Sequence, residues 1–207
     1  MTTFDKLVDV FRQFPGIGPR QAKRFVYFLL SREPEFIDEL AHLAGTIKQE
    51  IVQCKECYRF FHKRGTSSTC AICSDSNRTS SELMIVAKDT DLEAMEKSGM
   101  YDGRYFVLGG TIPLLEAKSK DVVRIAELKS RVTALVKQGV LQEVILALSL
   151  NTEGEYTGDE LRKFLSPILA GKEVKISMLG RGLSTGSELE YADKETLQSA
   201  LKNRSSS

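Results

Sequence analysis

The sequence predicts an α+β protein made of several small domains, and three observations lead to this fold class. Two amphipathic helical segments near the N-terminus are joined by a turn of glycine and proline, four cysteines stand in two close pairs, and short apolar segments alternate with helical ones from residue 81 onward. Strands that alternate with helices are typical of a parallel sheet with helices on both sides. We expect four consecutive domains, with the bounds 1–53, 54–79, 80–178 and 179–207.

The first domain contains two helical segments joined by the hairpin Pro15-Gly16-Ile17-Gly18-Pro19. Glycine lets the backbone approach a phosphate closely, and the amides of Gly16 and Gly18, with the N-terminus of the next helix, can bind it. Arg20 and Arg24 add positive charge at the same end. The pattern favours a helix-hairpin-helix that binds DNA independently of sequence. The alternative is an ordinary helical hairpin whose glycines only form a turn.

The four cysteines have the spacing of a zinc site. Cys54 and Cys57 form one pair, Cys70 and Cys73 form the other, and twelve residues separate the pairs. Thiolates at this spacing can hold Zn²⁺ from tight turns, and four of them complete its tetrahedral coordination. Because no position is left for water, we expect a structural rather than a catalytic site. The alternative is two disulfides or four unrelated buried thiols, which the absence of a signal segment disfavours.

The composition limits the classes of function. The net charge of +1 gives no global attraction to nucleic acid, so electrostatic binding must come from a local patch. The hydrophobic content of 42% is enough for a core, yet the longest apolar runs are far shorter than a membrane span. The N-terminal segment contains acids and lacks the apolar centre of a signal peptide. We expect a cytoplasmic protein without a membrane segment.

From residue 81 the pattern predicts an α/β domain. Short apolar segments are expected to form strands, and the third of them is apolar throughout, as in a strand buried on both faces. The expected strands are 83–87, 105–108, 144–148 and 174–178. The segments between them have helical periodicity. The expected helices are 91–98, 121–138, 157–169 and 194–202. A further helix is expected over 35–54 in the first domain, with Ile37, Leu40, Leu43, Ala44 and Ile47 facing a core.

The loop expected after the third strand carries two carboxylates, Glu153 and Glu155, on either side of a glycine. Ligands bind at the carboxyl ends of the strands in sheets of this type. The two glutamates could hold Mg²⁺ or meet a basic partner. The alternative is an acidic first turn that complements the dipole of the following helix, and composition alone favours this alternative.

Aromatic and basic side chains follow the first cysteine pair: Tyr58, Arg59, Phe60, Phe61, Lys63 and Arg64. We expect the three aromatic rings to pack over the metal site, and base stacking is the less favoured alternative. The three cations form a small basic cluster, whose simplest interpretation is a solvated loop.

Several motifs, taken in order, make the chain resemble the bacterial RecR family of recombination mediators over nearly its whole length. Each is modest alone, but their order and spacing together are highly specific. Besides the four cysteines they are Phe14-Pro15-Gly16-Ile17-Gly18-Pro19-Arg20, Arg104-Tyr105-Phe106-Val107-Leu108-Gly109-Gly110, Asn151-Thr152-Glu153-Gly154-Glu155, and the stretch from Gly182 to Asp193.

The resemblance implies a helix-hairpin-helix, a four-cysteine zinc finger, a Toprim domain and a C-terminal segment related to Walker motifs. Members of the family are not known as stand-alone catalysts. They form ring-like dimers and tetramers that can encircle DNA, and with RecO and RecF they help to load RecA onto DNA coated by single-strand-binding protein. Arg20 and Arg24 match the basic residues of the family that contact DNA. Glu153 and Glu155 match its acidic loop, which is implicated in partner binding.

One position departs from the family pattern. A Toprim domain usually carries a glutamate at the end of its first strand, where this chain has Ala87 followed by Lys88. Alanine can neither ligate a metal nor transfer a proton. The stretch 182–193 also lacks the Gly-Lys-Ser/Thr ending of a phosphate-binding loop. These features favour a non-enzymatic DNA clamp over the alternative, a metal-dependent Toprim nuclease or primase-like enzyme. Lys88 also inverts the local charge, so contacts with RecO or RecF could differ here.

Overall fold

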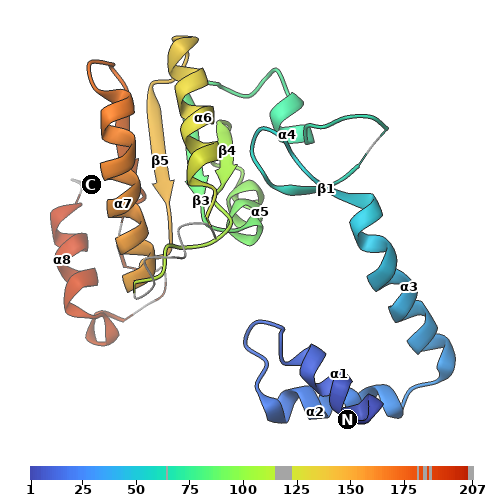
Figure 1. Ribbon diagram of the computed structural model, residues 1–207. Helices are drawn as coiled ribbons and strands as arrows, with labels where there is room; N and C mark the ends of the chain where they lie inside the picture. The colour runs from blue at the N-terminus through green and yellow to red at the C-terminus, as the bar shows by residue number, and fades with distance from the viewer. Residues whose placement is uncertain (64, 115–122, 181, 184–185, 187, 205–207) are drawn as a thin grey trace. The chain divides into compact units, whose positions relative to one another are not determined.

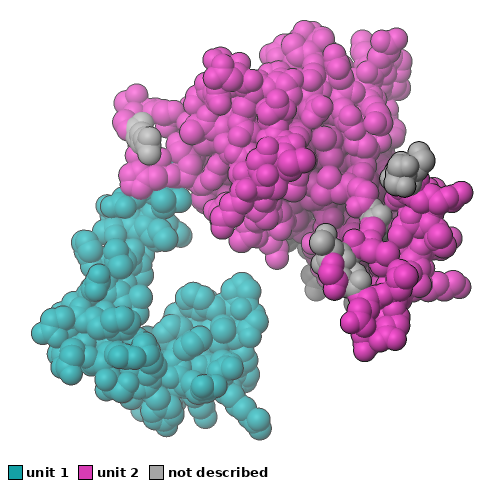
Figure 2. Space-filling model, turned by 180° about the vertical axis from the view of Figure 1, so that it is seen from behind, with its two compact units in different colours: residues 1–52 teal, residues 53–207 magenta. Residues whose placement is uncertain are grey.

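The computed structural model describes the chain except for residues 64, 115–122, 181, 184–185, 187 and 205–207. The chain divides into two compact units, Met1–Val52 and Gln53–Ser207, coloured teal and magenta in Figure 2. The first unit is helical, and the second contains the main sheet and the cysteines.

The first unit consists of α1 (Thr3–Phe11), α2 (Pro19–Leu30) and α3 (Pro34–Glu50). Helix α1 begins with a capping box, in which the side chains of Thr2 and Asp5 each accept a hydrogen bond from the other residue's backbone N–H. Gly18 is the N-cap of α2, and Pro19 stands in its first turn, where a missing N–H costs nothing. The expected pair of helices joined by a glycine hairpin is therefore present.

The core of the first unit is small, and α3 takes no part in it. The buried side chains are those of Val8, Ala22 and Val26, all from α1 and α2. The prediction that the apolar side chains of α3 face a core is wrong for the single chain, because none of its residues is buried. Leu43 and Ile47, for example, are each 56% exposed.

The helix expected over 35–54 also ends earlier than predicted. The chain leaves α3 after Glu50, and β1 (Ile51–Gln53) follows at once. Its first two residues are β-branched, and such side chains favour extended backbone. Strand β1 pairs with β2 (Phe60–His62), so the first cysteine pair lies in the connection between two strands.

The second unit is built on a parallel sheet in the order β4-β3-β5-β6. Strands β3, β4 and β5 are labelled in Figure 1. Its strands are β3 (Glu82–Val86), β4 (Arg104–Val107), β5 (Glu143–Ala147) and β6 (Lys175–Met178). All four overlap the expected strands. In the register, Leu83 of β3 lies opposite Arg104 of β4 and Val144 of β5. Together with the helical hairpin and the cysteine segment, this sheet confirms the predicted fold class.

The sheet is covered on both faces. One face packs against α6 (Ile125–Lys137) and α7 (Thr152–Leu169), and its buried layer includes Leu83, Ile85, Phe106, Leu128, Val132, Val144, Leu161 and Leu165. The opposite face packs against α5 (Asp89–Ser98) and the cysteine segment, whose short helix is α4 (Ala71–Ser74). That layer includes Cys54, Cys57, Cys70, Ile72, Met84, Val86, Leu92 and Tyr105. The strands are apolar on both sides because both faces are covered.

Two helices differ from their expected bounds. Helix α7 begins at Thr152 rather than at 157, because the side chain of Asn151 accepts a hydrogen bond from the N–H of Gly154 at 2.9 Å and caps the helix. The segment predicted as a loop is therefore the first part of α7. Helix α6 covers a shorter range than the expected 121–138, whose first two residues lie outside the described part of the chain. Helix α8 (Lys194–Lys202) agrees with expectation and follows the 3₁₀ turn η2 (Leu189–Tyr191).

Candidate metal centre and nucleic-acid interface

The four cysteine side chains converge on one point. Their sulfur atoms all lie within 4.8 Å of one another, and Cys57 Sγ is 3.6 Å from Cys70 Sγ. A disulfide requires sulfurs about 2.05 Å apart. None of the four thiols forms a disulfide in this structure. Four thiolates at about 2.3 Å from a tetrahedral Zn²⁺ stand about 3.8 Å from each other, so the spacing fits such an ion. The cluster could hold a metal ion.

Local backbone structure places the sulfurs. The N–H of Tyr58 donates to the carbonyl of Cys54, and the N–H of Cys54 donates to the carbonyl of Arg59 at 2.9 Å, which closes a tight turn around the first pair. Tyr58 has a φ of +62°, the left-handed conformation that such a turn needs. The two pairs meet where the N–H of Cys70 donates to Cys54 Sγ at 3.3 Å. A hydrogen bond from Cys57 also lowers the pKa of Cys54.

The cysteine segment is attached to the sheet by polar contacts as well as by packing. The N–H of Val107, at the end of β4, donates to the carbonyl of Cys57 at 2.7 Å. The buried guanidinium of Arg104 donates to the carbonyls of Ile72 and Asp75 at 2.6 and 2.8 Å. Bonds between a charged donor and a carbonyl are stronger than neutral ones. The cysteine segment is thus hydrogen-bonded to β4 through Cys57 of the first pair and through Ile72 and Asp75 next to the second.

The three aromatic residues of this segment do not behave alike. Tyr58 packs against Phe106 with ring centroids 5.3 Å apart, and Phe61 packs against the layer that contains the cysteines. Phe60 instead points outward and is 53% exposed. Tyr58 and Phe106 belong to the layer on the α6 and α7 face of the sheet, so the prediction that all three rings pack over the metal site is wrong for Tyr58 and Phe60 and is confirmed for Phe61. Arg64 of the basic cluster lies outside the described residues.

The hairpin of the first unit has the features of an anion site. Gly16 has a φ of +75°, a conformation that other residues rarely adopt, and the N-terminus of α2 follows directly. Arg20 and Arg24 are exposed on the first two turns of α2. Residues 12–32 contain five cations and no carboxylate, namely Arg12, Arg20, Lys23, Arg24 and Arg32.

The first unit separates its charges along the chain. Residues 33–50, which include α3, carry five carboxylates and the single cation Lys48. The net charge of this segment is therefore −4, against +5 for the segment 12–32. The small net charge of the whole chain thus conceals a strongly basic segment, residues 12–32, and the role of that segment in binding nucleic acid stays a prediction.

The two glutamates of the acidic motif lie in the first turn of α7, at the carboxyl edge of the sheet. Glu153 Oε2 accepts a hydrogen bond from Thr111 Oγ1 at 3.1 Å. Thr157 Oγ1 accepts from the N–H of Ile112 at 2.8 Å and donates to the carbonyl of Glu153. The loop after β4 therefore orients the acidic turn. This position agrees with the dipole-complementing alternative, and the role of Glu153 and Glu155 in partner binding stays a prediction.

Because Gly154 has no side chain, the backbone of α7 can pass close to the end of β5. A Cβ on Gly154 would overlap the carbonyl oxygen of Ser149. No larger residue fits there unless the backbone moves. The glycine between the two glutamates is thus a requirement of packing, which the sequence pattern alone does not reveal.

The end of β3 has no carboxylate in the position of the Toprim glutamate. Ala87 is buried at 2% exposure, and Lys88 is exposed. Asp89 Oδ1 accepts a hydrogen bond from the N–H of Phe60 at 2.7 Å, and Asp91 Oδ2 accepts from the N–H of Lys88. Within the described ranges, the cysteine cluster is the one group of three or more His, Cys, Asp or Glu side chains close enough to hold a metal.

Within the described part of the chain, no helix has the length and apolar character required to cross a membrane.

The fold and the two sites define a class of protein in which a helix-hairpin-helix accompanies a Toprim domain that carries a four-cysteine cluster. The family model for the RecR helix-hairpin-helix matches residues 4–45, the Toprim domain model matches 81–180, and the RecR C-terminal model matches 182–205. Recombination protein RecR of Ruegeria pomeroyi is 36% identical over 200 residues, which cover 97% of this chain and 94% of that protein. The chain belongs to the RecR family of recombination proteins.

Other relatives support the same assignment. Recombination protein RecR of Dehalococcoides mccartyi is 36% identical over 97% of this chain and 92% of its own length. The protein of the same name from Ureaplasma urealyticum is 33% identical over 97% of this chain and 94% of its own length. The resemblance inferred from the ordered motifs is therefore confirmed.

Proposed function

We propose that this chain is a non-enzymatic DNA-binding clamp of recombinational DNA repair. In the cytoplasm it binds DNA independently of sequence and helps RecO and RecF to load RecA onto DNA coated by single-strand-binding protein. The observation that carries the proposal is the basic hairpin of residues 12–32, where five cations and no acid surround a glycine turn that opens a helix. Phosphate is the common feature of all DNA sequences, so such a surface binds without sequence preference.

The DNA contact is tested by Arg20→Glu combined with Arg24→Glu. The double variant is expected to bind any DNA at least about tenfold more weakly, and the slope of log affinity against log salt is expected to fall by about 1.8 for duplex DNA, because two phosphate contacts are lost. Fluorescence anisotropy over a series of salt concentrations measures both quantities.

The matched control reverses two exposed cations of the same unit that lie outside residues 12–32, with Lys6→Glu and Lys48→Glu. These changes are expected to leave the salt slope almost unchanged. If the two double variants weaken binding equally, the contact is a general charge effect and the hairpin has only a structural role.

We infer that the four cysteines hold one structural Zn²⁺. Four buried or partly buried thiols at the spacing of a tetrahedral site support this metal, because zinc favours thiolate ligands and a closed site of four. The residues Cys54, Cys57, Cys70 and Cys73 would be its ligands. Bound there, the ion would hold together a segment that has little apolar core of its own.

We propose that the first unit mediates self-association into a dimer or a tetramer ring. Its apolar side chains are poorly covered in the single chain, and they line a groove of about 410 Å³ that includes Phe11, Phe14, Phe25, Phe28, Phe36 and Leu40. Exposed apolar surface of this kind is typical of protein interfaces. The basic hairpin and the acidic α3 also offer complementary charges between copies. The mass of the protein in solution, with and without DNA, tests this proposal.

The Toprim domain is proposed to act without catalysis. Ala87 supplies no carboxylate where a metal-dependent reaction needs one. The alternative, a Toprim nuclease or primase-like enzyme, is supported only by the presence of the domain itself. Cleavage or extension of DNA that depends on Mg²⁺ or Mn²⁺, and that Glu153→Gln abolishes, would establish the enzyme instead.

Glu153 and Glu155 are proposed to bind a basic surface of RecO. Replacing both by glutamine removes two charges, while the amide oxygen at position 153 can still accept from Thr111. Association with RecO is expected to slow by about tenfold and to lose most of its salt dependence. DNA binding should change little, because the removed groups repel phosphate. Surface plasmon resonance at two ionic strengths measures the association rate.

Asp159→Asn is the control for this pair, because it removes an exposed carboxylate from the same helix one turn later. It is expected to leave the association rate within about twofold of wild type. If the loss of both glutamate charges leaves RecO binding unchanged, RecO contacts a different part of the protein. Lys88 would then be the first residue to examine.

A further inference from the structure

An aromatic ring, that of Phe60, is exposed on the cysteine segment. Side chains alternate along β2, so that Phe61 faces the cysteine layer while Phe60 and His62 face outward. Phe60 is 53% exposed, although its strand and the turn before it are well ordered by hydrogen bonds. The π face of such a ring can stack on any nucleobase.

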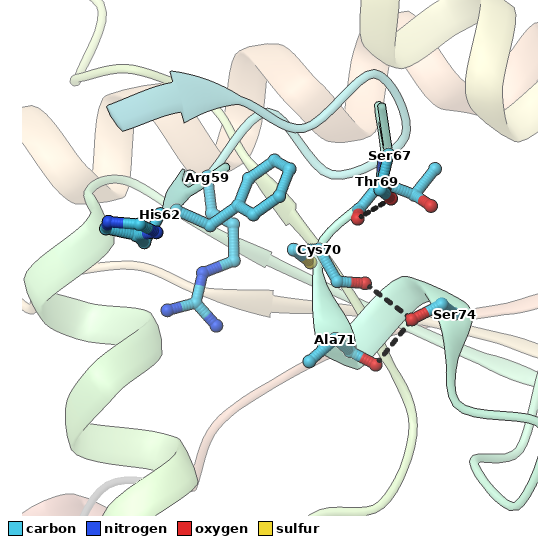
Figure 3. A pocket seen from close by; sticks show the side chains of 8 residues that line it. Arg59, His62, Ser67, Thr69, Cys70, Ala71 and Ser74 are labelled. Carbon is cyan, nitrogen blue, oxygen red and sulfur yellow. Dashed lines mark hydrogen bonds between the residues drawn. The ribbon is translucent and has the colours of Figure 1, made fainter. Parts of the chain in front are cut away.

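Cationic side chains flank this ring. Arg59 and Lys63 lie on either side of it in the sequence, and Lys63 is exposed. Within the described residues, Arg59 Nε is buried from solvent without a hydrogen-bond partner. The side chain of Arg59 lines a pocket of about 430 Å³ together with His62, Ser67, Thr69 and Ser74 (Figure 3). The same pocket is lined by Phe61, Cys70 and Ala71, so Arg59 lies on the cysteine side of the strand rather than beside the exposed ring.

The departure at the end of β3 adds a further cation. The N–H of Phe60 donates to Asp89 Oδ1 at 2.7 Å, which holds the start of α5 against β2 across 29 residues of sequence. Lys88 directly precedes Asp89 and is exposed. The carboxylate of Asp89 also lies here, but it accepts the Phe60 N–H. An acidic residue at position 88 would repel phosphate, whereas the lysine attracts it.

We propose that Phe60, Lys63 and Lys88 form a second nucleic-acid contact, specific for single strands. One unpaired base stacks on the ring of Phe60, and the cations bind the flanking phosphates. Duplex DNA keeps its bases stacked on one another, so the ring offers it nothing. This contact goes beyond the proposed hairpin site, because it lies in the other unit and reads a base rather than the backbone alone.

The test measures the affinity of the full-length protein for two single strands of equal length, an oligothymidylate and its abasic counterpart. Phe60→Ala is expected to weaken binding of the oligothymidylate at least about fivefold, as for other aromatic stacking platforms. Binding of the abasic strand and of duplex DNA should stay within about twofold of wild type, since neither offers an unpaired base. Phe60→Trp should restore binding of the oligothymidylate. Lys88→Glu should weaken both single strands and reduce the salt slope.

Met100→Ala is the matched control, because it removes another exposed apolar side chain from the same unit and should change none of these affinities. Zinc content and thermal unfolding of each variant report on its fold. Equal weakening of both single strands by Phe60→Ala, or no weakening of either, would overturn the proposal. This outcome can be told apart from a failure of the hairpin site. The Arg20 and Arg24 double variant is expected to weaken binding of duplex DNA, whereas the Phe60 variant is not.

Discussion

Replacing Cys57 by serine is expected to release the metal and to destabilise the whole second unit. Cys57 is fully buried and packs in the layer that covers one face of the sheet. Structural zinc supplies about 10 kcal/mol or more to the folding of small zinc peptides. The loss of one thiolate should therefore lower the thermal midpoint by about 10 °C or more, since each kcal/mol is worth about 2–4 °C in a chain of this size. Elemental analysis and thermal unfolding, with and without chelator, measure the two effects.

The control for this variant is Ile72→Val, which changes a buried neighbour in the same layer that is not a ligand. It is expected to cost about 0.5–1.5 kcal/mol and to leave the zinc content at one ion per chain. Freshly purified, reduced wild-type protein without zinc would contradict the metal assignment. So would a Cys57→Ser variant that unfolds at the same temperature as wild type.

Replacing Gly154 by alanine is expected to disrupt the start of α7. The added Cβ would overlap the carbonyl oxygen of Ser149, and a backbone group cannot move aside as a flexible side chain can. The first turn of α7 must then shift and lose the cap from Asn151 and the contact of Glu153 with Thr111. The expected cost is at least about 3 kcal/mol in the free energy of unfolding, which denaturant titration measures.

Gly158→Ala is the matched control, four residues later in the same helix. A Cβ there would meet Met178 and Leu148 at 3.6 and 3.8 Å, which is ordinary contact. This change is expected to leave stability unchanged or to raise it by up to about 1 kcal/mol, because alanine favours a helix more than glycine does. If the two alanine variants have equal stability, the close approach at Ser149 does not constrain the helix.

Features that depend on local spacing were accessible from the sequence alone. The four-cysteine cluster, the glycine hairpin between two helices and all four sheet strands were predicted in their correct places. These features are encoded by the chemistry and the periodicity of neighbouring residues. The ordered motifs also identified the family correctly. Each of these features is recognised from the spacing and order of residue types along the chain, so no knowledge of distant contacts was needed.

Only the tertiary structure decided which side chains of these elements are buried and which are exposed. Phe60 and Phe61 are adjacent and chemically identical, yet Phe60 is exposed and Phe61 packs inward, because the strand that contains them is oriented by a bond from the Phe60 N–H to Asp89. The apolar face of α3 has helical periodicity, and its Phe36 contacts Phe28 of α2, yet none of the described residues of α3 is buried. The acidic turn of α7 is likewise positioned by Thr111, far away in the sequence. Sequence periodicity shows whether one face of a helix or strand is apolar or polar. Which residues pack against that face is decided by contacts between residues that are distant along the chain.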